Sequence, residues 1–173
     1  NRTVRFPELQ AVFGSGPVTL TGTIALEGLR PGSVDLHLHG SGVRLRYPEG
    51  LVATLEGDLN LLGSPGERMV SGNLLLSDAL WTREYDLVSG ILSDREGAPL
   101  FTDFAENELL KNLRLDVRIR APGSLELRNS LAVVNASAEL ELRGTLGEPV
   151  LLGRSEATRG EMYFLGQRYE ITA

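Results

Sequence analysis

Apolar and polar residues alternate along most of this chain, and that two-residue period limits its fold more than any other feature. Successive side chains of a β-strand point to opposite faces of the sheet, so alternation marks a strand with one apolar and one wet face. The stretches from Val34 to His39, Leu51 to Leu61 and Leu113 to Arg120 all follow this pattern. Helical periodicity is nearly absent, so the sequence predicts an all-β fold of repeated antiparallel strands.

Clusters of glycine and proline interrupt the alternation, and we interpret them as turns that separate strands. They occur at Arg30 to Gly32, Tyr47 to Gly50 and Ala121 to Gly123. The stretch from Gly160 to Thr172 is predicted to form a hairpin that turns near Gly166.

The segment of residues 84–112 lacks the alternation that its neighbours show. We interpret it as an insertion or mobile linker, with a short helix from about Asp103 to Lys111. Deleting it should leave the strands on either side folded.

Composition excludes several classes of function. The 17 basic and 23 acidic residues give a net charge of −6, so nucleic acid is not an expected partner. Without cysteine the chain has no disulfide, thiolate nucleophile or cysteine-based zinc site. No apolar run approaches the roughly 18 residues of a membrane span. The chain starts without methionine or a signal-peptide pattern, and we expect it to be a segment of a longer protein.

An internal repeat appears when the sequence is shifted by 81 positions, the separation of Leu59 from Leu140. Identical residues then coincide: Leu59, Leu61, Gly63, Gly66, Glu67 and Gly72 meet Leu140, Leu142, Gly144, Gly147, Glu148 and Gly153. We expect two repeat units at about residues 33–83 and 114–164, within one β-trough segment that covers residues 1–173. A repeated strand unit that cannot bury its own apolar face favours a stacked, extendable architecture.

The stretch LELRGTLGEPVLLGRSEATRGEMYFLGQRYEI, from Leu140 to Ile171, resembles the C-terminal signature of TamB-like proteins of the AsmA-like superfamily. In that signature L-x-L-x-G-T-x-x-x-P leads into a strand, a glycine and a terminal hairpin. The upstream stretch from Gly32 to Ser64 also resembles the family. One departure is Arg68, which stands where the second copy has Pro149, so the first turn is expected to be built differently.

The resemblance implies an open sheet curled into a trough, the β-taco, with an apolar concave face. It also implies a parent protein that is anchored in the inner membrane, crosses the periplasm and meets an outer-membrane barrel partner, TamA. Such proteins are linked to phospholipid transport to the outer membrane and to autotransporter assembly. Phospholipid is therefore the expected ligand, and no cofactor is expected.

The candidate lipid groove is the set of aliphatic residues on one face of the alternating strands. It comprises Leu36, Leu38, Leu45, Leu55, Leu59, Leu61, Leu74, Leu76, Leu115, Val117, Ile119, Leu125, Leu127, Val134, Ala136, Leu140 and Leu142. Two alternatives remain open at this point. The strands can form a two-sheet sandwich that binds a partner protein, or a chaperone-like module that offers a sheet edge to nascent outer-membrane strands.

Catalytic and metal-binding motifs are missing, and we do not expect an enzyme. There is no G-x-S-x-G elbow and no H-E-x-x-H motif. Asp35, His37 and His39 share one strand face at a spacing that suits a metal, but the second copy places Asp116, Arg118 and Arg120 there. We interpret both sets as a solvated polar face.

Overall fold

The computed structural model describes residues 2–28, 30–46, 50–82, 111–164 and 166–172. Nearly all of these residues lie in strands, as the alternation predicts. The strands are β1 (Arg2–Phe13), β2 (Gly16–Glu27), β3 (Arg30–Leu45), β4 (Leu51–Ser64), β5 (Glu67–Thr82), β6 (Arg114–Arg128), β7 (Ala132–Thr145), β8 (Pro149–Phe164) and β9 (Gln167–Thr172).

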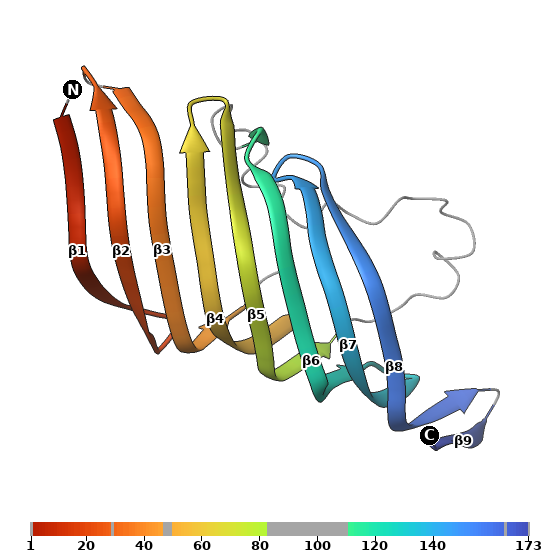
Figure 1. The fold of residues 1–173 in the computed structure, drawn as a ribbon. Coiled ribbons are helices and arrows are strands. Elements are labelled where there is room, and N and C mark those ends of the chain that lie inside the picture. The colour runs from red at the N-terminus through yellow and green to blue at the C-terminus, as the bar shows by residue number, and fades with distance from the viewer. Residues whose placement is uncertain (1, 29, 47–49, 83–110, 165, 173) are drawn as a thin grey trace.

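All nine strands form one sheet in the order of the sequence, from β1 at one edge to β9 at the other (Figure 1). The described residues therefore do not form a two-sheet sandwich, and that alternative is wrong for them. Pairing is antiparallel except between β5 and β6, which are parallel. The predicted fold of repeated antiparallel strands is confirmed, with this one parallel junction as an exception that was not predicted. Because β3–β5 and β6–β8 are both three-strand meanders running in the same directions, the last strand of one must meet the first of the other in parallel.

The sheet is not flat, because the long strands bend partway along their length and give it the form of a trough (Figure 1). The bend coincides with register shifts that recur along the sheet, at Gly40/Val43, Thr54/Leu55, Ala121/Leu125 and Asn135/Ala136. Extra residues in one strand of a pair bend that strand and increase its local twist. We call this line of bulges the crease.

At the crease, side-chain hydroxyl groups donate hydrogen bonds to backbone carbonyls near the register shifts. Ser77 Oγ donates to the carbonyl of Thr54 at 3.3 Å, Ser124 Oγ to that of Leu76 at 2.5 Å, and Thr158 Oγ1 to that of Asn135 at 3.1 Å. A bulge leaves carbonyls without ladder partners, so a short hydroxyl side chain at the bulge restores a bond.

Two of the predicted turns are wrong because their glycine and proline residues form bulges within strands. Arg30 to Gly32 lies inside β3, and Ala121 to Gly123 lies inside β6, where it forms part of the crease. Proline and glycine suit a bulge as well as a turn, because both need backbone that lacks regular pairing. The predicted C-terminal hairpin is confirmed, since β8 and β9 pair on either side of Gly166.

Other predictions concern positions outside the described residues. Residues 47–49 of one predicted turn and residues 84–110 of the predicted insertion, with most of its helix, belong to this group.

The two connections at which Arg68 and Pro149 differ are built differently, as expected. Between β4 and β5 the connection is Pro65-Gly66, and Gly66 adopts φ of 89°. Between β7 and β8, Glu148 N–H bonds both the carbonyl and the hydroxyl of Thr145, and Leu146, the counterpart of Pro65, donates its N–H to the carbonyl of Leu113. Proline has no N–H, so Pro65 cannot make such a backbone bond to a neighbouring segment.

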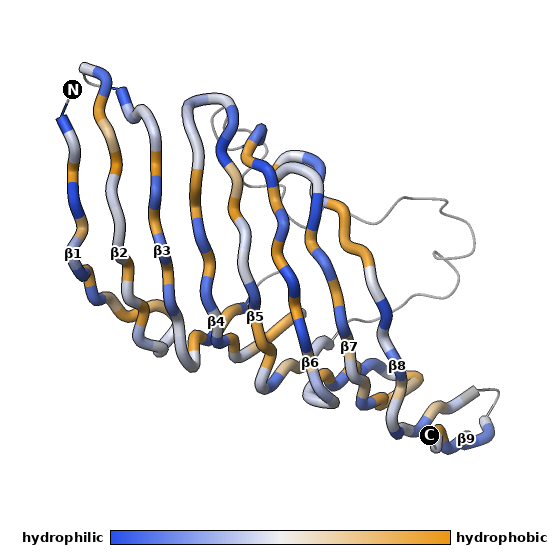
Figure 2. The backbone as a smooth tube through the Cα atoms, viewed as in Figure 1, coloured by the Kyte–Doolittle hydropathy of each residue, from blue (hydrophilic) through white to orange (hydrophobic). Residues whose placement is uncertain are grey.

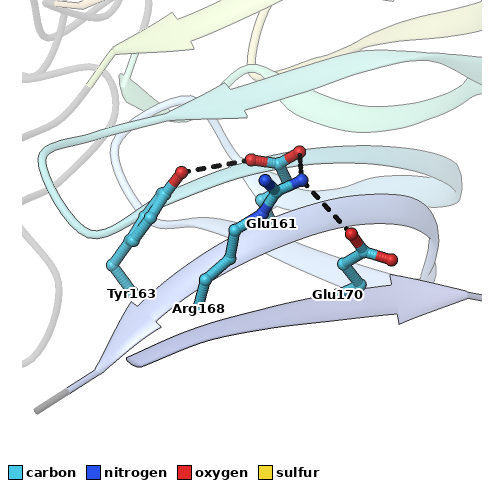
Figure 3. A network of polar contacts seen from close by, with 4 residues as sticks. All are labelled: Glu161, Tyr163, Arg168 and Glu170. Carbon is cyan, nitrogen blue, oxygen red and sulfur yellow. Dashed lines mark hydrogen bonds and ion pairs between the residues drawn. The ribbon is translucent and has the colours of Figure 1, made fainter. Parts of the chain in front are cut away.

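The terminal hairpin carries a small polar network on its outer side (Figure 3). Arg168 Nη2 lies 2.5 Å from Glu161 and 3.2 Å from Glu170, while the Tyr163 hydroxyl donates to Glu161 at 3.2 Å. Half-exposed ion pairs of this kind contribute at most about 1 kcal/mol. The network links the side chains of β8 and β9 but adds little to the stability of the sheet.

Candidate functional site on the inner face

The register of the strands shows which side chains share a face, because Cα partners in neighbouring strands point to the same side. All seventeen residues of the predicted groove fall on one face by this criterion. Transverse rows make the continuity plain. One row passes from Leu36 through Leu61 and Val70 to Leu115, and the next from Leu38 through Leu59 and Gly72 to Val117.

This face is the concave, inner face of the trough. Side chains crowd together on a concave surface, and the buried apolar residues of the described chain all lie here: Val34, Ala53, Ala79, Leu115, Val117, Ala121, Ala136 and Ala138. Five of these eight are alanines, and they line the crease, where there is least room. The small side chains let the two walls of the trough meet at an angle.

The larger inner side chains are only partly covered. Among the described residues none of the large side chains is fully buried, and Leu38 keeps 37% of its surface exposed. A closed domain of this size would bury its leucines in a packed core. The inner face therefore presents a continuous aliphatic surface to whatever occupies the trough.

The outer face carries the polar half of each strand, and Figure 2 shows the resulting alternation of hydrophobic and hydrophilic residues along the strands. His37 Nδ1 contacts Asn60 Oδ1 at 2.5 Å, and His39 Nδ1 contacts Asp58 at 2.8 Å. In the second unit Arg118 lies 3.9 Å from Glu141. Cross-strand polar pairs take the place of the metal ligands considered for His37 and His39, and no described group of three such side chains suits a metal ion.

Trp81 and Arg68 are two of several inner-face residues that lie outside the predicted groove. Trp81 lies in β5 beside Leu51 and Leu127, and its buried Nε1 has no hydrogen-bond partner among the described residues. Arg68 pairs with Gly63 and is the one charged side chain on the inner face of β2 to β9 within the described residues. Arg68 lies two residues before the aliphatic Val70, so the alternation along this strand would have placed it on the same face.

A family model for the TamB C-terminal domain matches residues 8–173, from within β1 to the last residue of the chain. The chain belongs to the TamB family. No curated protein and no solved structure matches it.

Membership in the TamB family places this chain among proteins of outer-membrane assembly that span the periplasm as parts of the cell envelope. The family acts in transport and assembly and works with TamA. Within the described part of this TamB domain, no helix is long and apolar enough to cross a membrane.

Proposed function

We propose that this TamB domain is a segment of a lipid-transfer protein, and that its inner face shields phospholipid acyl chains between the inner and outer membranes. The proposal rests chiefly on one observation, the continuous aliphatic inner face that no other described strand covers. Each methylene moved from water onto such a surface contributes about 0.8 kcal/mol. Two acyl chains would therefore be held without any polar recognition along the trough.

The form of the inner face suits a fluid ligand. Aliphatic side chains line most of it, and the transverse rows of leucine, valine and isoleucine continue from β3 to β7. Such a surface offers similar contacts at every position along the sheet, so an acyl chain can move without losing a specific bond. Transport by this route needs no covalent chemistry and no cofactor.

The domain organisation supports extension of the trough. Displacement by 81 residues carries β4 (Leu51–Ser64) onto β7 (Ala132–Thr145). We propose that residues 33–83 and 114–164 are two copies of one unit, and that further sheet in an inner-membrane-anchored parent protein lengthens the trough across the periplasm. The outer-membrane end would then meet a TamA-like barrel.

A matched pair of substitutions tests the proposal. Leu140 lies on the inner face beside Ile119 and Gly153, whereas Leu62 lies on the outer face beside Asp35 and Met69. Leu140→Arg places a charge beside the acyl chains, at a cost of several kcal/mol for charge in an apolar setting. Leu62→Arg adds the same charge to a solvated face.

The amount of co-purifying phospholipid is measured by mass spectrometry of organic extracts from the purified proteins. We expect co-purifying phospholipid in the wild type and in Leu62→Arg, and a loss of most of it in Leu140→Arg with circular dichroism unchanged. Absence of lipid from all three proteins would contradict the proposal.

A second candidate function has its own observation. β9 pairs only with the Arg159–Phe164 part of β8, so no described strand pairs with the edge from Pro149 to Thr158. Val150 and Leu152 are 47% and 51% exposed there. An open edge with apolar side chains can accept a strand by β-augmentation, as a chaperone for nascent outer-membrane strands would. Leu152→Pro should abolish capture of such strands while leaving lipid content unchanged.

A further inference from the structure

Arg68 lies where the inner face reaches the rim of the trough. Its Cα partner in β4 is Gly63, and Gly63 in turn pairs with Val34 of β3. A glycine at this position leaves space above β4, so the Arg68 side chain extends across that strand toward the start of β3. Charge at the end of an otherwise aliphatic face is the arrangement that complements an amphiphile.

Backbone carbonyls hold one end of the Arg68 guanidinium. Nη2 donates to the carbonyl oxygens of Pro31 and Gly32 at 2.9 and 3.1 Å. Both belong to the start of β3, where the register with β2 shifts. These bonds orient the guanidinium but do not neutralise it, and no described carboxylate lies within 4.0 Å of it.

Another atom of the same side chain has no partner. Arg68 Nε is buried and makes no hydrogen bond among the described residues. Buried N–H groups are nearly always satisfied in folded proteins, and those of a charged group are the most costly to leave open. A guanidinium with an open donor and no described carboxylate partner suits an anionic ligand.

A hollow of about 600 Å³ opens beside this guanidinium at the rim of the trough. It brings together the β2–β3 connection, the β4–β5 connection and the residues before β6, and its lining is Glu27, Arg30, Pro31, Pro65, Gly66, Arg68 and Asn112. The lining therefore includes two arginines and one glutamate. Arg68 comes from the inner face, and Glu27 and Arg30 pair with each other at the ends of β2 and β3. The Glu27 side chain lies against Gly32, since a Cβ built there would be 3.3 Å from Glu27 Oε1.

We propose that this hollow binds the headgroup of a zwitterionic phospholipid, in which a phosphodiester carries a primary ammonium. Arg68 and Arg30 bind the phosphodiester, and Glu27 accepts hydrogen bonds from the ammonium. Guanidinium suits this role because its planar fork matches two phosphate oxygens at once. The inference rests on the proposed function, because the acyl chains of the same lipid would lie on the inner face next to Val34.

The test loads the purified protein from vesicles with equal amounts of phosphatidylethanolamine and phosphatidylglycerol, and quantifies bound lipid by mass spectrometry after gel filtration. We expect phosphatidylethanolamine to be enriched on the wild type. Arg68→Gln and Arg68→Lys should both lower total bound lipid, the former about tenfold, the change that one charge-assisted hydrogen bond produces. Arg44→Gln, on the exposed outer face of β3, is the matched control and should change nothing.

Glu27→Gln separates the two halves of the site. It should bring the ratio of the two lipids close to one without lowering total bound lipid, and because Arg68 is intact this variant does not depend on the carbonyl bonds at Pro31 and Gly32. Calorimetry with inorganic phosphate distinguishes the lipid from a free anion. We expect no measurable phosphate binding, because phosphate lacks the acyl chains that anchor the lipid.

The possible failures are distinguishable. The headgroup site would be overturned if the wild type, Arg68→Gln, Arg68→Lys and Glu27→Gln all bound lipid equally. The proposed lipid-transfer function would not be affected by that result. A wild type that takes up no lipid would overturn the proposed function itself. Phosphate binding to the wild type that Arg68→Lys abolishes, with no lipid preference, would identify a free-anion site and overturn the proposal.

Discussion

The inner and outer faces of this TamB domain are made by the same strands, yet they are held by different forces. The inner face carries every buried apolar residue that the structure describes, whereas the outer face is organised by exposed cross-strand pairs such as Arg118 with Glu141. Aliphatic burial is worth far more than exposed ion pairing. Stability and the proposed function therefore compete for the same residues, while the outer face keeps the sheet soluble and in register.

The largest expected effect concerns the curvature that makes one face the inner one. Gly57 adopts φ of 151°, and a Cβ there would lie 2.1 Å from the carbonyl oxygen of Asn73. Gly57→Ala should destabilise the sheet by about 3 kcal/mol, because backbone must shift to relieve the clash. Its Cα partner Gly40 has no such φ, and a Cβ there meets only side chains, those of Val43 at 3.1 Å and Val18 at 3.8 Å.

Gly40→Ala is thus the control, with a loss of less than about 1 kcal/mol expected in urea denaturation. Equal losses for the two variants would show that the backbone at Gly57 does not set the curvature.

A smaller effect separates the two faces directly. Leu115 is 8% exposed on the inner face, whereas Leu62 is 38% exposed on the outer face. Leu115→Ala should cost about 2 kcal/mol, at the low end for buried leucine, because an open trough lets neighbours relax. Leu62→Ala should cost less than about 0.5 kcal/mol. Thermal melts in which Leu62→Ala is less stable than Leu115→Ala would contradict the claim that the inner face contributes more to stability than the outer face.

The smallest effect belongs to the outer face alone. Glu141 lies 2.8 Å from Arg143 and 3.9 Å from Arg118, but its side chain is 40% exposed. Glu141→Gln should change the free energy of unfolding by less than about 0.5 kcal/mol, because water already screens these charges. A loss above 1.5 kcal/mol would mean that the outer ladders hold the sheet together.

The alternation of the sequence correctly predicted which residues share a face of the sheet, because side chains alternate between faces along each strand on both sides of a bulge. Leu38 and Leu59, for example, were placed together by alternation alone and are Cα partners in β3 and β4. It failed at Ala121 to Gly123, where the chemistry that ends a strand also builds a bulge within one. The parallel pairing of β5 with β6 was missed as well, because alternation fixes the face of a strand but not the direction of its neighbour.

Arg68 shows a different limit. The comparison of repeats singled it out as a departure from Pro149, but only the register with Gly63 and the carbonyls of Pro31 and Gly32 reveals that it extends over the rim of the inner face. Residues distant in sequence form that hollow, and no local pattern indicates them.

The central claim is that lipid follows the inner face, and photo-crosslinking tests it most directly. A photoreactive residue is placed at Leu38, Leu59, Val117 or Leu140 on the inner face, or at His37, Asn60, Arg118 or Glu141, their immediate neighbours on the outer face. Each inner position is the sequence neighbour of an outer one, so the two sets sample the same strands at the same level of the trough. We expect phospholipid adducts from the first four positions and none from the second four. Equal adduct yields from the two faces would contradict it.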